Sequence, residues 1–296
     1  MHRNDPCWCG SGKKWKHCHF PNQNQASAPF QSLKEHYKKT WGILLKTPEQ
    51  IDGIRQACHL AASILDKTCA MAKEGVSLEE LNDFAHKLHL EAGATPAPLH
   101  YGHPPFPKSI CTSLNEVICH GIPDKTRLKS GDILNIDVTC IYKGYYGDCS
   151  RMVWIGAISE EKKLVIETSY HSMMKSIEIL KPGLALCEIG KAITDYAHSR
   201  KCSVVDVFVG HGVGVKFHEA PNVCHHLNRD QTPLAAGMTF TIEPMINAGV
   251  KHAVVDPRDK WTARTADGRA SGQWEHTILI TETGYEILTP WTPLLP

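Results

Sequence analysis

Two acidic residues stand where predicted strands bring their side chains toward the interior. Asp137 ends the apolar stretch LKSGDILNID, and Asp148 follows eleven residues later, after a hairpin turn at 142–144. The turn predicts that the two carboxylates lie opposite one another on adjacent strands. An ionised carboxylate is costly in an interior unless a cation or several donors meet it. The pair therefore indicates either a metal site or acids that cap turns and pair with Arg151 or Lys143.

Three further residues have a similar placing. Glu243 ends the apolar stretch LAAGMTFTIE, and Glu275 begins the strand-like segment EHTILI. His211 follows the apolar stretch VVDVFVG and is flanked by glycines, which let the backbone approach a neighbour closely. Four carboxylates with one imidazole suit manganese, iron, cobalt or zinc, and shared carboxylates suit two such ions.

The segments that carry these acids are repeated. LKSGDILNID is echoed 106 residues later by LAAGMTFTIE, and GVSLEEL is echoed 108 residues later by GLALCEI. Two echoes at nearly one offset indicate a duplication of about a hundred residues. We therefore expect two α+β halves related by a pseudo-twofold axis, with their sheets adjacent. Asp137 and Glu243 would then face each other across that axis.

A second group of ligand-type residues lies near the N-terminus. Cys7, Cys9, Cys18 and His19 fall within thirteen residues. Such a segment is too short to form a hydrophobic core, so a tetrahedral zinc ion would supply its folding energy. The alternative is that these are incidental cysteines in a tail.

Composition describes an ordinary soluble globular protein. The chain has 296 residues, of which 42% are hydrophobic and 21% charged. It has no apolar run of the ~20 residues that a membrane helix needs and no signal-peptide core. We therefore expect a cytoplasmic protein in which the twelve cysteines are reduced thiols. Residues 1–41 hold seven Lys/Arg against two Asp/Glu, so the arm is basic and the body mildly acidic.

The chain divides into three predicted parts. These are a zinc-binding docking motif at 1–20, a linker at 21–46 that includes PNQNQASAP, and a catalytic domain at 47–296. Thr47 and Ser77 are predicted N-caps with capping boxes. The other predicted elements are helices at 160–181 and 186–200 and strands at 133–141, 145–155, 203–209, 238–243 and 274–280.

From about Thr47 to Pro290 the sequence resembles a type I methionine aminopeptidase, a family M24 metallopeptidase with the pita-bread (creatinase/aminopeptidase) fold. The motifs that carry the resemblance are EVICHGIPD, GDILNIDVT, YYGDCSRM, GHGVGVKFHEAPNV, FTIEPMIN and WEHTILIT. It implies that two divalent metal ions are bound, with Asp148 and Glu275 bridging them. The implied metal ligands are Asp137, Asp148, His211, Glu243 and Glu275.

The resemblance also implies catalytic and substrate-binding roles. His120 and His218 would hydrogen-bond the substrate, and Glu243 would accept the proton of the hydroxide-forming water. Hydroxide activated by two metals would then remove the N-terminal methionine of nascent proteins, with a preference for a small second residue. The methionine side chain would lie in a pocket formed by Tyr101, Phe106, Cys111, Phe217 and Trp261.

The N-terminal motif resembles the small zinc motif at the C-terminus of the preprotein-translocase ATPase, through the stretch CWCGSGKKWKHC. The resemblance implies a docking module. Lysines beside Trp8 and Trp15 suit acidic or RNA surfaces, and we expect the ribosome as the partner. We also expect a monomer.

Two other functions compete with this interpretation. A prolidase or aminopeptidase P-like peptidase would share the metal ligands, but those relatives usually carry a long N-terminal domain, and here about 45 residues precede the first predicted helix. A catalytically silent pita-bread protein acting as a ribosome or RNA adaptor would have no need for four buried carboxylates.

Overall fold

The computed structural model describes residue 14, residues 28–291 and residues 293–296. The predicted zinc ligands Cys7, Cys9, Cys18 and His19 lie outside the described residues. The helices of the described part are α1 (Ala28–Trp41), α2 (Pro48–Met71), α3 (Leu78–Glu91), α4 (Glu160–Glu178) and α5 (Cys187–Ser199).

Two of the helices begin at the predicted capping boxes. The hydroxyl of Thr47 accepts from the amide of Gln50, and the Gln50 side chain accepts from the amide of Thr47. Ser77 and Glu80 form the same reciprocal pair at the start of α3. These bonds satisfy amides that a helix N-terminus leaves without partners. The predicted starts of both helices are confirmed.

The strands form two larger sheets and two smaller ones. The first sheet has the order β1-β4-β2, with β5 also paired to β4, and the largest has the order β15-β14-β9-β7-β8. The smaller sheets have the orders β13-β10-β6 and β11-β12-β3. The strands of the first half are β1 (Thr95–Pro96), β2 (Cys111–Leu114), β3 (Val117–Cys119), β4 (Ile133–Tyr142) and β5 (Tyr145–Trp154). The remaining strands are β6 (Ser203–Val204), β7 (Gly210–Gly212), β8 (Glu219–Val223), β9 (Thr239–Ile242), β10 (Met245–Asn247), β11 (Ala253–Val255), β12 (Ala263–Thr265), β13 (Ser271–Gln273), β14 (His276–Ile280) and β15 (Tyr285–Ile287).

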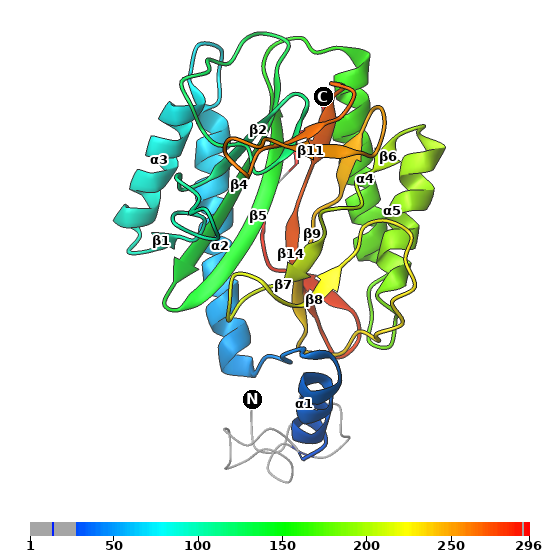
Figure 1. Cartoon of the computed structure of the whole chain (residues 1–296). Helices are drawn as coiled ribbons and strands as arrows, with labels where there is room; N and C mark the ends of the chain where they lie inside the picture. The colour runs from blue at the N-terminus through cyan, green and yellow to red at the C-terminus, as the bar shows by residue number, and fades with distance from the viewer. Residues whose placement is uncertain (1–13, 15–27, 292) are drawn as a thin grey trace.

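The helices flank the sheets in pairs. Figure 1 shows α2 and α3 on one side of the molecule, α4 and α5 on the other, and the strands between them. Helix α2 packs on β4 and β5, and α4 packs on β10 and β13. One large hydrophobic cluster draws side chains from both pairs of helices and from the strands between them. This α+β arrangement is the predicted one.

Equivalent backbone bonds relate the two halves. The amide of Gly75 donates to the carbonyl of Leu128 at 2.8 Å, and the amide of Gly183 donates to that of Leu234 at 2.8 Å. Both glycines have a positive φ, 86° and 87°, which glycine adopts without strain. The repeats in the sequence therefore occupy equivalent places in the fold, as the duplication predicts.

The predicted register of the hairpin between Asp137 and Asp148 is wrong by two residues. Strand β4 turns into β5 through Lys143 and Gly144, which have φ of 50° and 83°. A two-residue turn of this kind needs left-handed conformations at both central positions. The turn therefore consists of Lys143 and Gly144 alone, and Tyr142 remains on β4. Thr139 pairs with Asp148, and Asp137 pairs with Ser150. The two acids lie diagonally on one face of the hairpin, not directly opposite.

The predicted linker at 21–46 is also corrected, because residues 28–41 form α1. Phe30 and Trp41 pack against the core, and Tyr37 is buried and donates its hydroxyl to the carbonyl of Pro233. The spacing of these aromatic residues is helical. Helix α1 and the segment after it are therefore part of the folded body.

The predicted strand at 203–209 is shorter in the structure. Only Ser203–Val204 pair as a strand, although the amide of Val205 still donates to Met245. Beyond Val205 the chain leaves the sheet, and residues 207–209 line a pocket instead.

Candidate metal and substrate site

The predicted acids converge from both halves of the molecule. Asp137 lies on β4 and Asp148 on β5, whereas Glu243 directly follows β9 and Glu275 directly precedes β14. The amide of Glu275 donates to the carbonyl of Ser150 at 3.1 Å, which fixes the start of β14 against β5. This contact brings the acid of the second half beside the hairpin of the first.

His211 reaches the acids because the backbone around it is closely packed. A Cβ on Gly210 would lie 2.5 Å from the carbonyl oxygen of Thr241, and one on Gly212 would lie 2.3 Å from that of Ala220. Any other residue at these positions would displace β7 from its neighbours. The flanking glycines thus allow β7 to sit where the imidazole points at the carboxylates.

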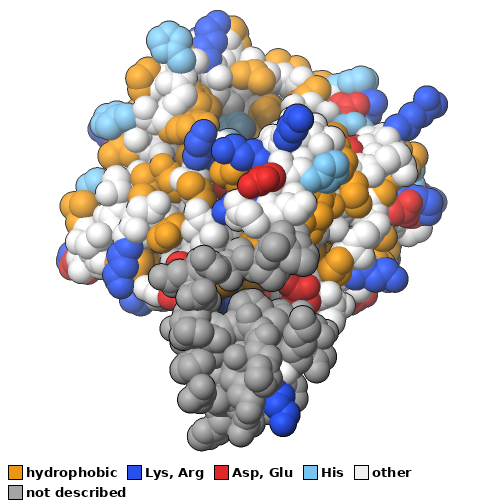
Figure 2. Space-filling model, turned by 90° about the horizontal axis from the view of Figure 1, so that it is seen from below, with side chains coloured by type: hydrophobic (Ala, Val, Ile, Leu, Met, Phe, Trp, Pro, Cys, Tyr) orange, Lys and Arg blue, Asp and Glu red, His pale blue; other side chains and the backbone are white. Residues whose placement is uncertain are grey.

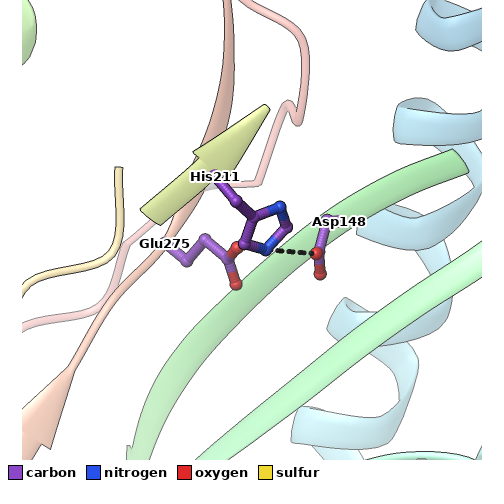
Figure 3. A group of neighbouring side chains, drawn as sticks. All are labelled: Asp148, His211 and Glu275. Carbon is purple, nitrogen blue, oxygen red and sulfur yellow. Dashed lines mark ion pairs between the residues drawn. The ribbon is translucent and has the colours of Figure 1, made fainter. Parts of the chain in front are cut away.

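The imidazole and the acids lie at metal-ligand spacing. The His211 Nε2 atom is 3.7 Å from Asp148 Oδ2 and 3.7 Å from Glu243 Oε1. Figure 3 shows His211, Asp148 and Glu275 pointing toward one another. One ligand atom from each of these three residues lies within 4.8 Å of the other two. Separations of this size are too long for hydrogen bonds and leave space between the side chains for a cation.

Burial sets the protonation of the site. It raises the pKa of Asp148 to about 7, although the hydrogen bond from Thr139 acts in the opposite direction. Burial also raises the pKa values of Asp137, Glu243 and Glu275 well above their usual range, and the neighbouring carboxylates add to the rise. Without a cation, several of these acids would therefore hold protons at neutral pH.

Two observations show that these residues fit a divalent cation. The Oδ1 atom of Asp137 is buried and has no hydrogen-bond partner among the described residues. Burial lowers the pKa of His211 to about 3, so its imidazole is neutral and makes no ion pair with the acids. A neutral imidazole and an unpaired carboxylate oxygen are the donor forms that metals require.

Three supporting residues were not predicted from the sequence. Thr139 donates to Asp148 Oδ1 at 2.7 Å, Thr241 donates to Glu243 Oε1 at 2.7 Å, and the Gln273 amide donates to Glu243 Oε2 at 3.1 Å. Strand alternation was an available signal for Thr139 and Thr241, because each lies two residues from a predicted ligand. It gave no signal for Gln273, because β13 and β14 belong to different sheets.

The acids form one wall of a pocket of about 460 Å³. Every predicted metal ligand, both predicted catalytic histidines and all five predicted side-chain-pocket residues line it. Their placement in one cavity agrees with the predicted roles, which remain predictions. The lining also includes Phe208 and Met245, which the sequence did not point to.

Aromatic contacts order the rest of the pocket. His218 lies with its ring centroid 4.1 Å from that of His211 and 5.1 Å from that of Tyr101. His120 has a positive φ of 55° and meets the edge of Trp261 at 5.9 Å. Burial lowers the pKa values of His120 and His218 to about 4. Both imidazoles are therefore neutral at pH 7, and each holds one donor and one acceptor nitrogen.

Comparison with known proteins gives concordant matches. Residues 52–282 match metallopeptidase family M24. The chain is 59% identical over 289 residues to a methionine aminopeptidase of Chlamydia pneumoniae, covering 98% of this chain and 99% of that protein. A crystal structure of methionine aminopeptidase from Rickettsia prowazekii superposes with a TM-score of 0.81 at 45% identity, covering 84% of this chain and 100% of that one. A prolidase from Pyrococcus furiosus, 22% identical with a TM-score of 0.68, covers 89% of this chain and 68% of that one and shares the fold alone.

The N-terminal segment has a match of its own. Residues 3–21 match the SEC-C motif. The match spans the four predicted zinc ligands, and it agrees with the resemblance of this stretch to a small zinc motif.

Proposed function

The chain belongs to metallopeptidase family M24, and on that premise we propose that it is a methionine aminopeptidase that removes the N-terminal methionine from newly made polypeptides. The observation that carries this proposal is one pocket in which four buried carboxylates, a neutral His211 and an aromatic wall meet. The relative from Chlamydia pneumoniae, which matches nearly the whole chain, supports the same activity.

We propose that the metal ions are held by both halves of the molecule. The ligands would be Asp137, Asp148, His211, Glu243 and Glu275. Divalent ions bound there would neutralise the carboxylates and supply the Lewis acidity that amide hydrolysis needs. Which ion is physiological depends on availability as well as on the ligands.

Glu243 is suited to accept the proton of the attacking water. Thr241 and Gln273 each donate to one of its carboxylate oxygens, so the group is oriented before substrate arrives. A carboxylate held by neutral donors can still take up a proton, because neither donor charge-pairs with it. His120 and His218 lie in the same pocket as neutral imidazoles and would hydrogen-bond the peptide beside the bond that is cleaved.

The aromatic wall suits the methionine side chain. Phe106 packs edge-on against Trp261 at 5.3 Å, and Tyr101 lies 4.7 Å from Phe217. Cys111 completes the wall with a thiol whose pKa burial raises well above its usual value, so it is neutral. A soft, neutral lining of this kind favours a flexible thioether. A pocket of this size would also favour a small second residue.

The N-terminal motif would act as a separate docking module. We propose that Cys7, Cys9, Cys18 and His19 hold one zinc ion, which the match to the SEC-C motif supports. The face of the body in Figure 2 mixes both signs of charge with hydrophobic side chains. Electrostatic attraction to the ribosome would come from the lysines of the arm. A Cys7→Ala/Cys9→Ala variant should lose one zinc per chain, keep its peptidase activity and bind ribosomes more weakly.

The expected location is the cytoplasm, where nascent chains are found, and the expected state is a monomer. Among the described residues, no helix combines the length and apolar character needed to cross a membrane.

A peptide panel tests the proposed activity. The full-length protein with manganese or cobalt should release free methionine from Met-Ala-Ser and should not cleave Xaa-Pro peptides. The opposite pattern would identify a prolidase-like enzyme. Activity that persists in Asp148→Ala would mean that the catalytic site lies elsewhere, and no activity on any peptide would favour the adaptor function.

A further inference from the structure

A buried ion pair lies beside the pocket, whose lining includes Glu219. Lys46 Nζ is 2.9 Å from Glu219 Oε1, and the two side chains are only 1% and 5% exposed. Lys46 precedes both the predicted catalytic domain and the segment that matches family M24. A buried charge without its partner is strongly unfavourable, so each of these side chains fixes the position of the other.

Glu219 is joined to the loop that carries two predicted substrate-binding residues. It directly follows Phe217 and His218 and opens β8. The same Oε1 atom that meets Lys46 lies 3.3 Å from the amide of Val215, from which it accepts a hydrogen bond. The carboxylate thus ties both ends of a turn of five residues, 215–219, and the His218 ring projects from between them.

The lysine is itself held rigidly. Its backbone amide donates to the carbonyl of Gly237 at 2.8 Å, and the preceding Leu45 is fully buried. Gly237 lies two residues before β9, the strand that leads to Glu243. The segment around Lys46 therefore contacts the His218 turn through its side chain and the approach to Glu243 through its backbone.

We propose that Lys46 is a positioning residue for substrate binding, which orients the turn 215–219 through Glu219 and so places His218 and Phe217 in the pocket. This inference rests on the proposed function. Burial lowers the pKa of Lys46, and Glu219 partly reverses that effect, so the ammonium form depends on its partner. For stability alone, a well-packed apolar pair would serve as well as a buried ion pair. The charges instead give the turn a fixed geometry, because Glu219 must meet both Lys46 and the amide of Val215.

Two variants separate positioning from mere stability. Lys46→Met should destabilise the protein and lower kcat/KM for Met-Ala-Ser by at least about tenfold, mainly through KM, because small misplacements of binding groups are costly. Lys46→Met/Glu219→Leu removes both charges, and its melting temperature should recover toward that of the wild type. Its kcat/KM should stay low, since the turn has lost the acceptor for the amide of Val215. In both variants, amide hydrogen exchange across residues 213–219 should be faster than in the wild type.

Two controls complete the experiment. Lys191→Met breaks an exposed pair with Asp195, which at 2.8 Å is about as short as the buried pair, and should change neither KM nor exchange in the turn. Ile177→Ala, in the hydrophobic core on α4, should lower the melting temperature with KM unchanged.

The outcomes are distinct. A double variant that regains wild-type kcat/KM and wild-type exchange along with its melting temperature would overturn the inference, because the pair would then be purely structural. A wild-type protein that does not cleave Met-Ala-Ser would refute the proposed function instead. The hydrogen exchange of the turn would still decide the positioning role in that case.

Discussion

The two halves of the molecule place acids at equivalent positions and treat them differently. Asp137 and Glu243 are separated by the 106-residue offset of the repeats, and each ends the corresponding segment. Asp137 has a buried oxygen with no partner among the described residues, whereas both oxygens of Glu243 receive hydrogen bonds. Asp137 therefore needs a cation to satisfy its buried oxygen, whereas hydrogen bonds within the protein orient Glu243 before substrate binds. The duplicated backbone places the two acids at equivalent positions, and the side chains around each acid determine its role.

The halves also differ in what else they deliver. The first half gives a hairpin of two ten-residue strands that carries both aspartates. The second half gives shorter strands, the imidazole of His211 and the turn that bears His218. Each half thus supplies two of the four carboxylates, and the second half adds the imidazole of His211. The predicted substrate-binding residues come from both halves.

The largest expected effect comes from neutralising each of the paired acids. We expect Asp137→Asn and Glu243→Gln each to lower kcat/KM by more than about a hundredfold, because even residues that only orient metal ligands cost 10–100-fold. Excess metal should partly restore Asp137→Asn, whose role is to hold the cation. It should not restore Glu243→Gln, which also loses the proton acceptor. Activity measured against metal concentration checks this. Equal rescue of both variants would show that Asp137 and Glu243 have the same role.

Asp137 and Glu243 could be predicted from sequence because they stand at the ends of apolar segments and recur at one offset. The helix starts at Thr47 and Ser77 could also be predicted, since capping is a local signal. The hairpin register was missed because it depends on which two residues form the turn. Gln273 and the Lys46–Glu219 pair depend on contacts between residues far apart in sequence, which no local pattern encodes. The zinc ligands of the N-terminal motif remain a prediction.

A smaller effect is expected from removing the donors that hold the acids. Thr241→Val should lower kcat by roughly tenfold even at saturating metal, because it disturbs the orientation of Glu243 as the proton acceptor. Thr139→Val should instead weaken metal binding, because its hydroxyl bonds to Asp148 on the hairpin. Kinetics combined with a metal titration separate the two. Identical profiles would show that the two halves share both tasks.

In the metal-free protein, Asp148 should contribute an inverted dependence of stability on pH. The pKa of Asp148 is about 7 in the folded state and about 3.9 in an unfolded chain. Below about pH 4 the carboxyl is protonated in both states. Between these values the folded state keeps a proton that the unfolded chain has released, so rising pH favours unfolding. The buried histidines act in the opposite direction over this range, because burial lowers their pKa values. The test therefore compares two proteins: in EDTA the melting temperature of the wild type relative to that of Asp148→Asn should fall from pH 4.5 to 7.

Bound metal should abolish the contribution of Asp148, since the ligands are then ionised in the folded state too. A metal-free wild-type protein whose melting temperature does not fall relative to that of Asp148→Asn over this range would show that Asp148 is not buried as described.

The smallest expected effect concerns the helix starts, where the two repeats have different residues at the capping position. Ser77 caps α3, and the corresponding position before α5 is Ala185, without a side-chain cap at that helix. Ser77→Ala should lower the free energy of unfolding by about 1 kcal/mol. Ala185→Ser should return only a few tenths of that, because the amide that a serine would cap, on Glu188, already donates to the carbonyl of Ala185 at 3.0 Å. Chemical denaturation of both variants measures the difference. A full gain from Ala185→Ser would mean that the hydrogen bond between Glu188 and Ala185 does not take the place of a side-chain cap.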